Sequence, residues 1–147
     1  MKEKTNILIC EDDINLSSIV ADYLRNNDYV VDVAKDGKEG LEKSMNSHYD
    51  ICLLDIMMPN MNGFDMLQQL RANGRELPVI IVSGRASKED IINGYKLGCD
   101  DYITKPYVPR IMLSRVGRIL ELYELRKSLE KQLEKKIRHA QKEIDAL

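Results

Sequence analysis

The sequence predicts an open, doubly wound α/β fold built on a parallel sheet. Four short apolar runs have the length of a strand, a weaker fifth run follows them, and the segments between the runs carry apolar residues at helical spacing. Because a return to a parallel strand needs a crossover of about a dozen residues, this alternation favours a parallel sheet covered on both faces. The runs are residues 7–10, 29–33, 51–54, 79–82 and, more weakly, 102–103.

Capping and turn residues separate the expected strands from the expected helices. Asp13 can cap the first helix, and Ser87 with Asp90 forms a capping-box pattern at the start of the fourth. Gly74 and Pro78 bracket a turn into the fourth strand. Together with the helical spacing between the runs, these signals predict a helix after each of the first four strands.

A fifth helix is expected from about Pro109, a residue suited to a first helical turn, to the end of the sequence. Its second half carries apolar residues every three or four positions, which forms one seam along the helix. Two consecutive four-residue steps, from Leu129 through Leu133 to Ile137, interrupt the heptad and predict local unwinding of a supercoil. The seam residues are Leu122, Leu125, Leu129, Leu133, Ile137, Ala140, Ile144 and Leu147.

A lone charged helix with an exposed leucine seam is poorly stabilised in water. We therefore expect residues 123–147 to be a coiled-coil linker that forms a homodimer with a second copy of the chain. There are two alternatives: the helix folds back on its own domain, or it frays because its true partner is missing.

Composition excludes several classes of protein. Hydrophobic residues make up 44% and charged residues 31%, no apolar run reaches the ~20 residues of a membrane span, and residues 1–6 show no secretory signal. The net charge of −2 comes without a separate basic cluster, so no direct contact with nucleic acid is expected. Cys10, Cys52 and Cys99 form no CxxC pair and predict reduced core thiols in a cytoplasmic protein.

Polar residues follow the expected strands, and in open parallel sheets ligands bind beyond the carboxyl ends of the strands. Carboxylates gathered there repel one another unless they share a cation, and oxygen ligands favour Mg²⁺. A further carboxylate beside such a metal can attack phosphorus, while a lysine and a hydroxyl can stabilise the transferred group. The residues are Glu11, Asp12 and Asp13 after the first strand, Asp55 after the third, Ser83 after the fourth and Lys105 after the fifth.

Four ordered motifs carry a resemblance to a known family. They read ILICEDD at residues 7–13, LLDIMMPNMNG at 53–63, PVIIVSG at 78–84 and GCDDYITKP at 98–106. Together they resemble the receiver domain of two-component response regulators, from about residue 6 to about residue 122. The resemblance implies a flavodoxin-like, five-stranded sheet of order 2-1-3-4-5 and a receiver domain over residues 1–122.

The resemblance also implies roles for individual residues. Asp55 would receive a phosphoryl group from a phosphohistidine on a sensor histidine kinase or phosphotransfer protein, and would later lose it by self-dephosphorylation. Mg²⁺ would lie on Glu11, Asp12, Asp55 and the backbone carbonyl of Met57. Ser83 and Lys105 would contact the phosphoryl oxygens, and Tyr102 would turn inward when Ser83 moves. The face of the fourth helix, fifth strand and fifth helix would then change.

Three features vary from the family pattern or within it. Tyr107 stands where phenylalanine is usual, and Pro109 opens the last helix early, which predicts a stiff loop after Lys105. The resemblance also implies that Met57 and Arg85 occupy variable positions, which would tune how long the phosphoryl group survives.

Other readings of the same residues are weaker. A flavin-binding protein needs a phosphate-friendly first loop, and the acidic residues 11–13 would repel a phosphate. A phosphatase of the haloacid dehalogenase type needs an aspartate where Met57 stands. A receiver-like dimerisation module that never takes phosphate is the remaining alternative.

The output is expected to lie in a domain absent from this chain, so the chain is not expected to be an enzyme itself. Residues 120–126 resemble the link between receivers and cyclic-di-GMP enzymes, and residues 145–147 resemble the opening of a diguanylate cyclase domain. Cyclic-di-GMP turnover is therefore a hypothesis for the output.

Overall fold

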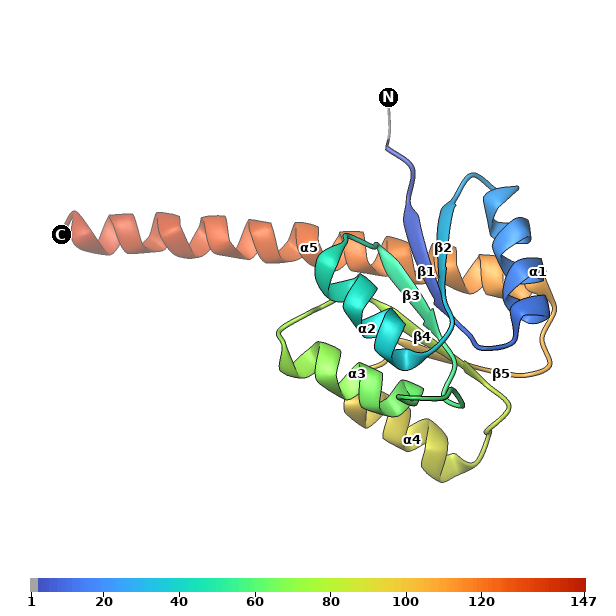
Figure 1. Ribbon diagram of the computed structural model, residues 1–147. Helices are drawn as coiled ribbons and strands as arrows, with labels where there is room; N and C mark the ends of the chain where they lie inside the picture. Colours follow the sequence, from blue (N-terminus) through green and yellow to red (C-terminus); the bar gives the residue numbers. More distant parts are fainter. Residues whose placement is uncertain (1–2) are drawn as a thin grey trace.

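The computed structural model describes residues 3–147 and contains a five-stranded parallel sheet with helices on both faces (Figure 1). The strand order β2-β1-β3-β4-β5 confirms the expected fold class and topology. Residues 1 and 2, at the start of the expected receiver domain, lie outside the described residues. The strands are β1 (Asn6–Cys10), β2 (Val30–Ala34), β3 (Ile51–Leu54), β4 (Val79–Ser83) and β5 (Asp101–Thr104).

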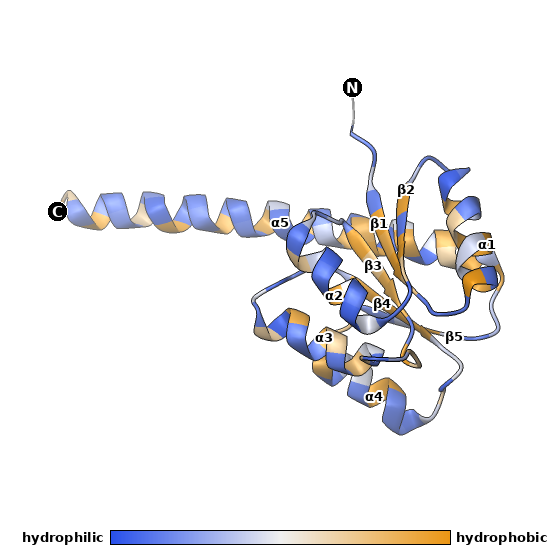
Figure 2. Cartoon of the chain, viewed as in Figure 1, coloured by the Kyte–Doolittle hydropathy of each residue, from blue (hydrophilic) through white to orange (hydrophobic). Residues whose placement is uncertain are grey.

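Five helices complete the two outer layers. One core cluster joins the sheet to α1 and α5, and a second joins the opposite face of the sheet to α2, α3 and α4. The apolar residues therefore gather along the strands at the centre of the molecule (Figure 2). The helices are α1 (Ile14–Arg25), α2 (Gly37–Asn46), α3 (Gly63–Ala72), α4 (Lys88–Leu97) and α5 (Pro109–Asp145).

The inner strands β1, β3 and β4 are buried on both faces, which explains why they read as continuous apolar runs. In β1, Ile7 and Ile9 face the cluster with α1 and α5, whereas Leu8 and Cys10 face the other cluster. Cys10, Cys52 and Cys99 are free and buried, as expected.

Strand limits differ slightly from those expected, because hydrogen-bonded pairing extends beyond the apolar runs. β2 extends to Ala34, which pairs with Cys10, and Ser83 is the last residue of β4, where it pairs with Thr104. The Asp13 and Ser87 caps are confirmed, since each side chain accepts backbone N–H groups at the start of its helix.

The long helix α5 has two different halves. Met112, Val116 and Ile119 are buried against the sheet, whereas residues 128–147 are exposed along their whole length and project from the domain (Figure 1). An ion pair of 2.6 Å between Lys127 and Glu76 ties the helix to the loop before β4. The projecting half does not fold back on the domain. Within residues 3–147, no helix has the length and apolarity to cross a membrane.

Candidate functional site

The ends of four strands bring the expected site residues to one edge of the sheet. Glu11 directly follows β1 and Asp55 directly follows β3, and these strands are neighbours with Cys10 opposite Leu54. The Asp55 amide donates to the Cys10 carbonyl at 3.0 Å, which fixes the two carboxylates beside each other. Ser83 ends β4 and Lys105 follows β5.

Three carboxylates form an acidic cluster at this edge. One oxygen from each of Glu11, Asp12 and Asp55 lies within 4.8 Å of the others. Glu11 and Asp55 are only 7% and 6% exposed, whereas Asp12 is open to solvent. The neighbouring Asp13 serves as the helix cap, so the structure separates its role from that of the cluster.

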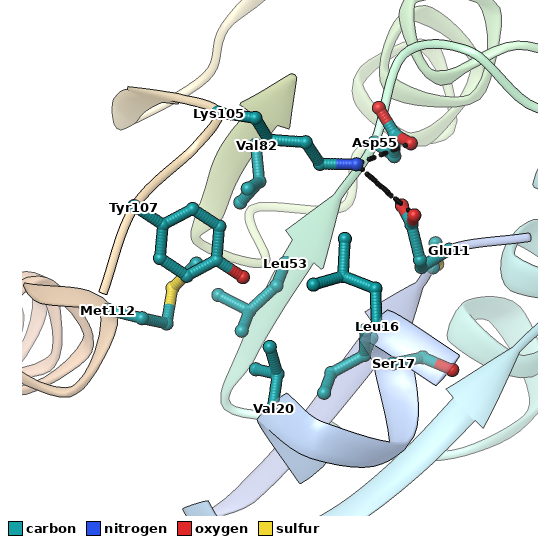
Figure 3. Close-up of a pocket in the computed structure, with 12 residues that line it drawn as sticks. Glu11, Leu16, Ser17, Val20, Leu53, Asp55, Val82, Lys105, Tyr107 and Met112 are labelled. Atoms are coloured by element: carbon teal, nitrogen blue, oxygen red, sulfur yellow. Dashed lines mark hydrogen bonds and ion pairs between the residues drawn. The ribbon is translucent and has the colours of Figure 1, made fainter. Parts of the chain in front are cut away.

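Lys105 reaches across the sheet edge into the cluster. Its Nζ lies 3.1 Å from Oε1 of Glu11 and 3.1 Å from Oδ2 of Asp55 (Figure 3). The Lys105 amide donates to the Ser83 carbonyl at 2.8 Å, which anchors the start of the loop after β5 to the end of β4. The ammonium group is thus held against both buried carboxylates.

The cluster strongly affects its own ionisation. Burial, a hydrogen bond with Asp55 and the charge of Asp55 raise the pKa of Glu11 to about 8, although Lys105 opposes this shift. Burial lowers the pKa of Lys105, but the charges and hydrogen bonds of Asp55 and Glu11 outweigh it and raise that pKa above its usual value. Lys105 is therefore cationic, and the cluster favours additional positive charge.

The donor set fits a magnesium ion. Mg²⁺ prefers oxygen ligands in an octahedron whose opposite ligands are roughly 4 Å apart, so oxygens within 4.8 Å of each other need only small adjustments to share it. Glu11, Asp12 and Asp55 supply such oxygens. The Met57 side chain is 60% exposed, and its sulfur lies 3.9 Å from Nη1 of Arg85. A thioether is in any case a soft ligand, so only the Met57 carbonyl suits this metal.

Ser83 and Tyr102 are connected through the backbone of Arg85. The fully buried Ser83 hydroxyl accepts the Arg85 amide at 3.1 Å, and the Tyr102 hydroxyl donates to the Arg85 carbonyl at 2.6 Å. Tyr102 itself is 9% exposed. A movement of Ser83 would therefore change the position of Arg85, whose carbonyl accepts the hydrogen bond of the Tyr102 hydroxyl.

The Arg85 side chain adds a link to α4. Its guanidinium forms an ion pair of 2.7 Å with Asp90 and lies 5.8 Å from the centre of the Phe64 ring. The sequence marked Arg85 only as a variable position, because nothing in the pattern shows which groups its backbone and side chain would meet.

The loop between β3 and α3 is held by residues that the sequence did not single out. Asp36 is 5% exposed and accepts the side-chain amide of Asn60 at 2.8 Å and the backbone amide of Glu39 at 2.7 Å. The Gly37 amide donates to the Met61 carbonyl at 3.1 Å. Asn60 has a φ of +67°, which asparagine tolerates well. The turn-forming residues between β3 and α3 indicate a loop, but they do not show that Asp36 and Gly37 would hold it.

A small cavity lies beneath the cluster, between the sheet, α1 and α5. Its volume is about 20 Å³, and Leu16, Val20 and Met112 contribute apolar walls. The Tyr107 ring lines it below Lys105 (Figure 3). Burial raises the pKa of the Tyr107 hydroxyl, which keeps this side chain neutral. Tyr107, which stands where the family usually has phenylalanine, thus forms part of the cavity wall.

Comparisons with known proteins agree with this geometry. The family model of the response regulator receiver domain matches residues 7–117. Transcriptional regulatory protein RprY of Bacteroides fragilis is 39% identical over 130 residues, which cover 88% of this chain and 55% of that protein. Response regulator ArlR of Staphylococcus saprophyticus is 40% identical over 79% of this chain and 52% of its own. The chain thus spans about half the length of these relatives.

Solved structures of receiver domains share the fold. A CheY-like receiver domain protein of Methanospirillum hungatei gives a TM-score of 0.81 at 31% identity, covering 84% of this chain and 99% of that one. The receiver domain of a Francisella response regulator gives 0.79 at 33% identity, covering 82% and 99%.

The relatives do not support two expectations about the output. RprY, like CiaR of Streptococcus pneumoniae, which is 41% identical over 78% of this chain and 51% of its own, is named a transcriptional regulatory protein. Neither name supports cyclic-di-GMP turnover, and neither supports the expectation of no nucleic-acid partner.

The acidic cluster, the lysine that bridges it and the sheet order agree with the family match, and the chain belongs to the response regulator receiver domain family.

Proposed function

We propose that Asp55 is the phosphoacceptor of a two-component phosphorelay. The observation that carries the proposal is the position of the Lys105 ammonium, 3.1 Å from both Glu11 and Asp55 at the edge of a cluster suited to Mg²⁺. A nucleophilic carboxylate beside a fixed cation and a metal site is what phosphoryl transfer needs, since positioning and charge neutralisation dominate that chemistry.

The donor is a phosphohistidine of a sensor histidine kinase or phosphotransfer protein, and the cytoplasm is the proposed location. One oxygen of Asp55 attacks the phosphorus, the bond between phosphorus and the imidazole nitrogen breaks, and the nitrogen keeps the electron pair and takes a proton. Mg²⁺, held by Glu11, Asp12, Asp55 and the Met57 carbonyl, supplies positive charge to the phosphoryl oxygens when bound. Later attack by water on phosphorus returns the Asp55 carboxylate and inorganic phosphate.

Lys105 and Ser83 bind the phosphoryl group of phosphorylated Asp55. Lys105 pairs with a phosphoryl oxygen, and the Ser83 hydroxyl turns from the Arg85 amide to donate to another. Tyr102 follows, because its hydroxyl is bound to the Arg85 carbonyl. Only a difference in binding between two arrangements can shift the population, and these contacts provide it. The shifted surface comprises α4, β5 and α5.

The output we propose is control of transcription in the whole protein, on the basis of the names of RprY and CiaR. We also propose that residues 1–122 act as the receiver and that residues 123–147 form a linker through which two copies dimerise. The exposed seam supports this: Leu125, Leu129 and Leu133 are 55–59% exposed. A switch at α5 then reaches the output through one continuous helix.

Incubation with acetyl phosphate tests the proposal without a kinase. With Mg²⁺, the intact mass of the protein should rise by one phosphoryl group, and chelation of the metal should abolish the change. Asp55→Asn should stay unmodified, while Asp13→Asn, which alters a cap outside the cluster, should behave as the wild type. An unmodified wild type would favour the receiver-like dimerisation module instead.

A further inference from the structure

The apolar seam of α5 lies to one side of the stripe that packs on the receiver. On a helix with about 100° per residue, the buried stripe of Met112, Val116 and Ile119 is centred roughly 110° around from Leu129. Lys127, which binds Glu76 at 2.6 Å, lies roughly 160° around from Leu129. The receiver therefore contacts other sides of the helix, and the seam beyond Leu122 stays exposed.

Charged residues flank the start of the seam on opposite sides. With Leu122 and Leu125 as the core positions of the first heptad, Glu121 precedes the seam on one flank and Arg126 follows it on the other. Both are exposed, and within residues 3–147 Glu121 forms no ion pair; Arg126 reaches Glu130 only at 3.9 Å. Glu121 is thus available to a cation on another molecule.

We propose that the partner is a second copy of this chain, paired with α5 parallel and in register, so that Glu121 of each copy meets Arg126 of the other. This inference rests on the proposed homodimer and specifies its geometry. In parallel coiled coils these two flanking positions, five residues apart, face each other across the interface and set orientation. The two receivers then lie at the same end of the dimer.

The spacing of the seam also favours this arrangement. From Leu122 to Leu147 its steps are 3, 4, 4, 4, 3, 4 and 3 residues, which is a different series when read backwards. In a parallel, in-register pair, each seam residue faces the same residue of the other copy, so unequal steps do not disturb the packing. Antiparallel pairing of residues 122–147 shifts the middle layers by one residue, or about 1.5 Å.

Cysteine cross-linking tests the orientation in the full chain. Ile144→Cys, on the seam near the far end, should form a disulfide-linked dimer under oxidised glutathione, since a parallel pair brings the two copies of residue 144 together. Arg138→Cys, on the outer face, is the matched control and should not cross-link. The native thiols are buried and stay out of the reaction. A dimeric mass by light scattering without cross-linking at residue 144 would overturn the parallel arrangement, and a monomeric mass would overturn the dimer itself.

A charge swap tests the register. Glu121→Arg and Arg126→Glu should each weaken the dimer by about threefold or more, because each places like charges opposite one another twice. The double variant should recover the wild-type dissociation constant; a double variant as weak as the singles would refute the pairing. Phosphorylation of Asp55 by acetyl phosphate, measured on the same variants, should not change, which separates failure of this inference from failure of the receiver function.

Discussion

Lys105 lies between Glu11 and Asp55 and holds together charges that would otherwise repel. It is partly exposed, but the two carboxylates that it contacts are nearly buried. Even with Lys105 in contact, burial and the neighbouring Asp55 raise the pKa of Glu11 to about 8, so the cluster favours a further cation. The cation that the proposed phosphoryl transfer needs thus also relieves repulsion in the resting protein.

Replacement of Lys105 by methionine should show this double role. In EDTA we expect Lys105→Met to lower the free energy of unfolding by about 1–2 kcal/mol, because the buried carboxylates lose their partner. Addition of Mg²⁺ should restore part of the loss, since the metal binds the folded cluster. Urea unfolding with and without Mg²⁺ measures both effects. Lys96→Met, an exposed lysine on α4, is the control, and an equal loss there would contradict the argument.

At the scale of the element, an ion-pair network fastens the edge strand β2 to α2. Asp32 on β2 accepts Lys43 of α2 at 3.0 Å and the Tyr49 hydroxyl at 2.6 Å. Burial alone would raise the pKa of Asp32, but these two groups outweigh it and lower that pKa below its usual value. Burial and the charge of Asp32 raise the pKa of Tyr49, so its hydroxyl stays a donor.

This network predicts a pH-dependent contribution to stability. A carboxyl group with a lowered pKa in the folded state stabilises the fold above its unfolded pKa of about 3.9, and this contribution is lost as the pH falls through the folded value. Asp32→Asn should therefore destabilise the protein at pH 7, by up to ~1 kcal/mol because the side chain is 44% exposed and screened by solvent. The difference from the wild type should shrink below about pH 4. A constant difference across this range, measured by urea unfolding, would rule the network out as its source.

The pair of Asp36 and Asn60 should position the loop that carries Met57. Asp36→Asn loses an acceptor for either Glu39 or Asn60, and Asn60→Asp places two carboxylates together, so each should loosen residues 57–61 and weaken Mg²⁺ binding severalfold. The double exchange restores one hydrogen bond with the roles reversed and should recover much of the affinity. Calorimetric Mg²⁺ titration and hydrogen exchange on this loop check the result; a double variant no better than the singles would count against the pairing.

The sequence predicted elements better than it predicted contacts between them. Strand order, the caps at Asp13 and Ser87 and the convergence of Glu11, Asp55 and Lys105 followed from periodicity, turn chemistry and the family motifs. The contacts of Arg85 and the bond between Asp36 and Asn60 did not, because they depend on loop conformations and on partners far away in the chain. Similarly, only the structure shows that Lys127 binds Glu76 and thereby orients the seam.

For the whole molecule, the projecting half of α5 should be independent of the receiver. The domain core ends at Ile119, so the chain truncated after Leu122 should remain folded and phosphorylatable. It should be a monomer by light scattering, while the full chain is a dimer. Because isolated helices of this length are marginal in water, the far-UV circular dichroism of the full chain should lose helix signal on dilution, and that of the truncated chain should not. Equal masses for the two chains would count against the seam.

Reductive trapping of the phosphorylated residue tests the central claim most directly. Borohydride converts an acyl phosphate to an alcohol, so the modified carboxylate can be located by peptide mass mapping after reaction with acetyl phosphate and Mg²⁺. We predict that the reduced residue is Asp55 and that it disappears when the metal is chelated. Reduction at Glu11, Asp12 or another carboxylate, with Asp55 intact, would contradict the account.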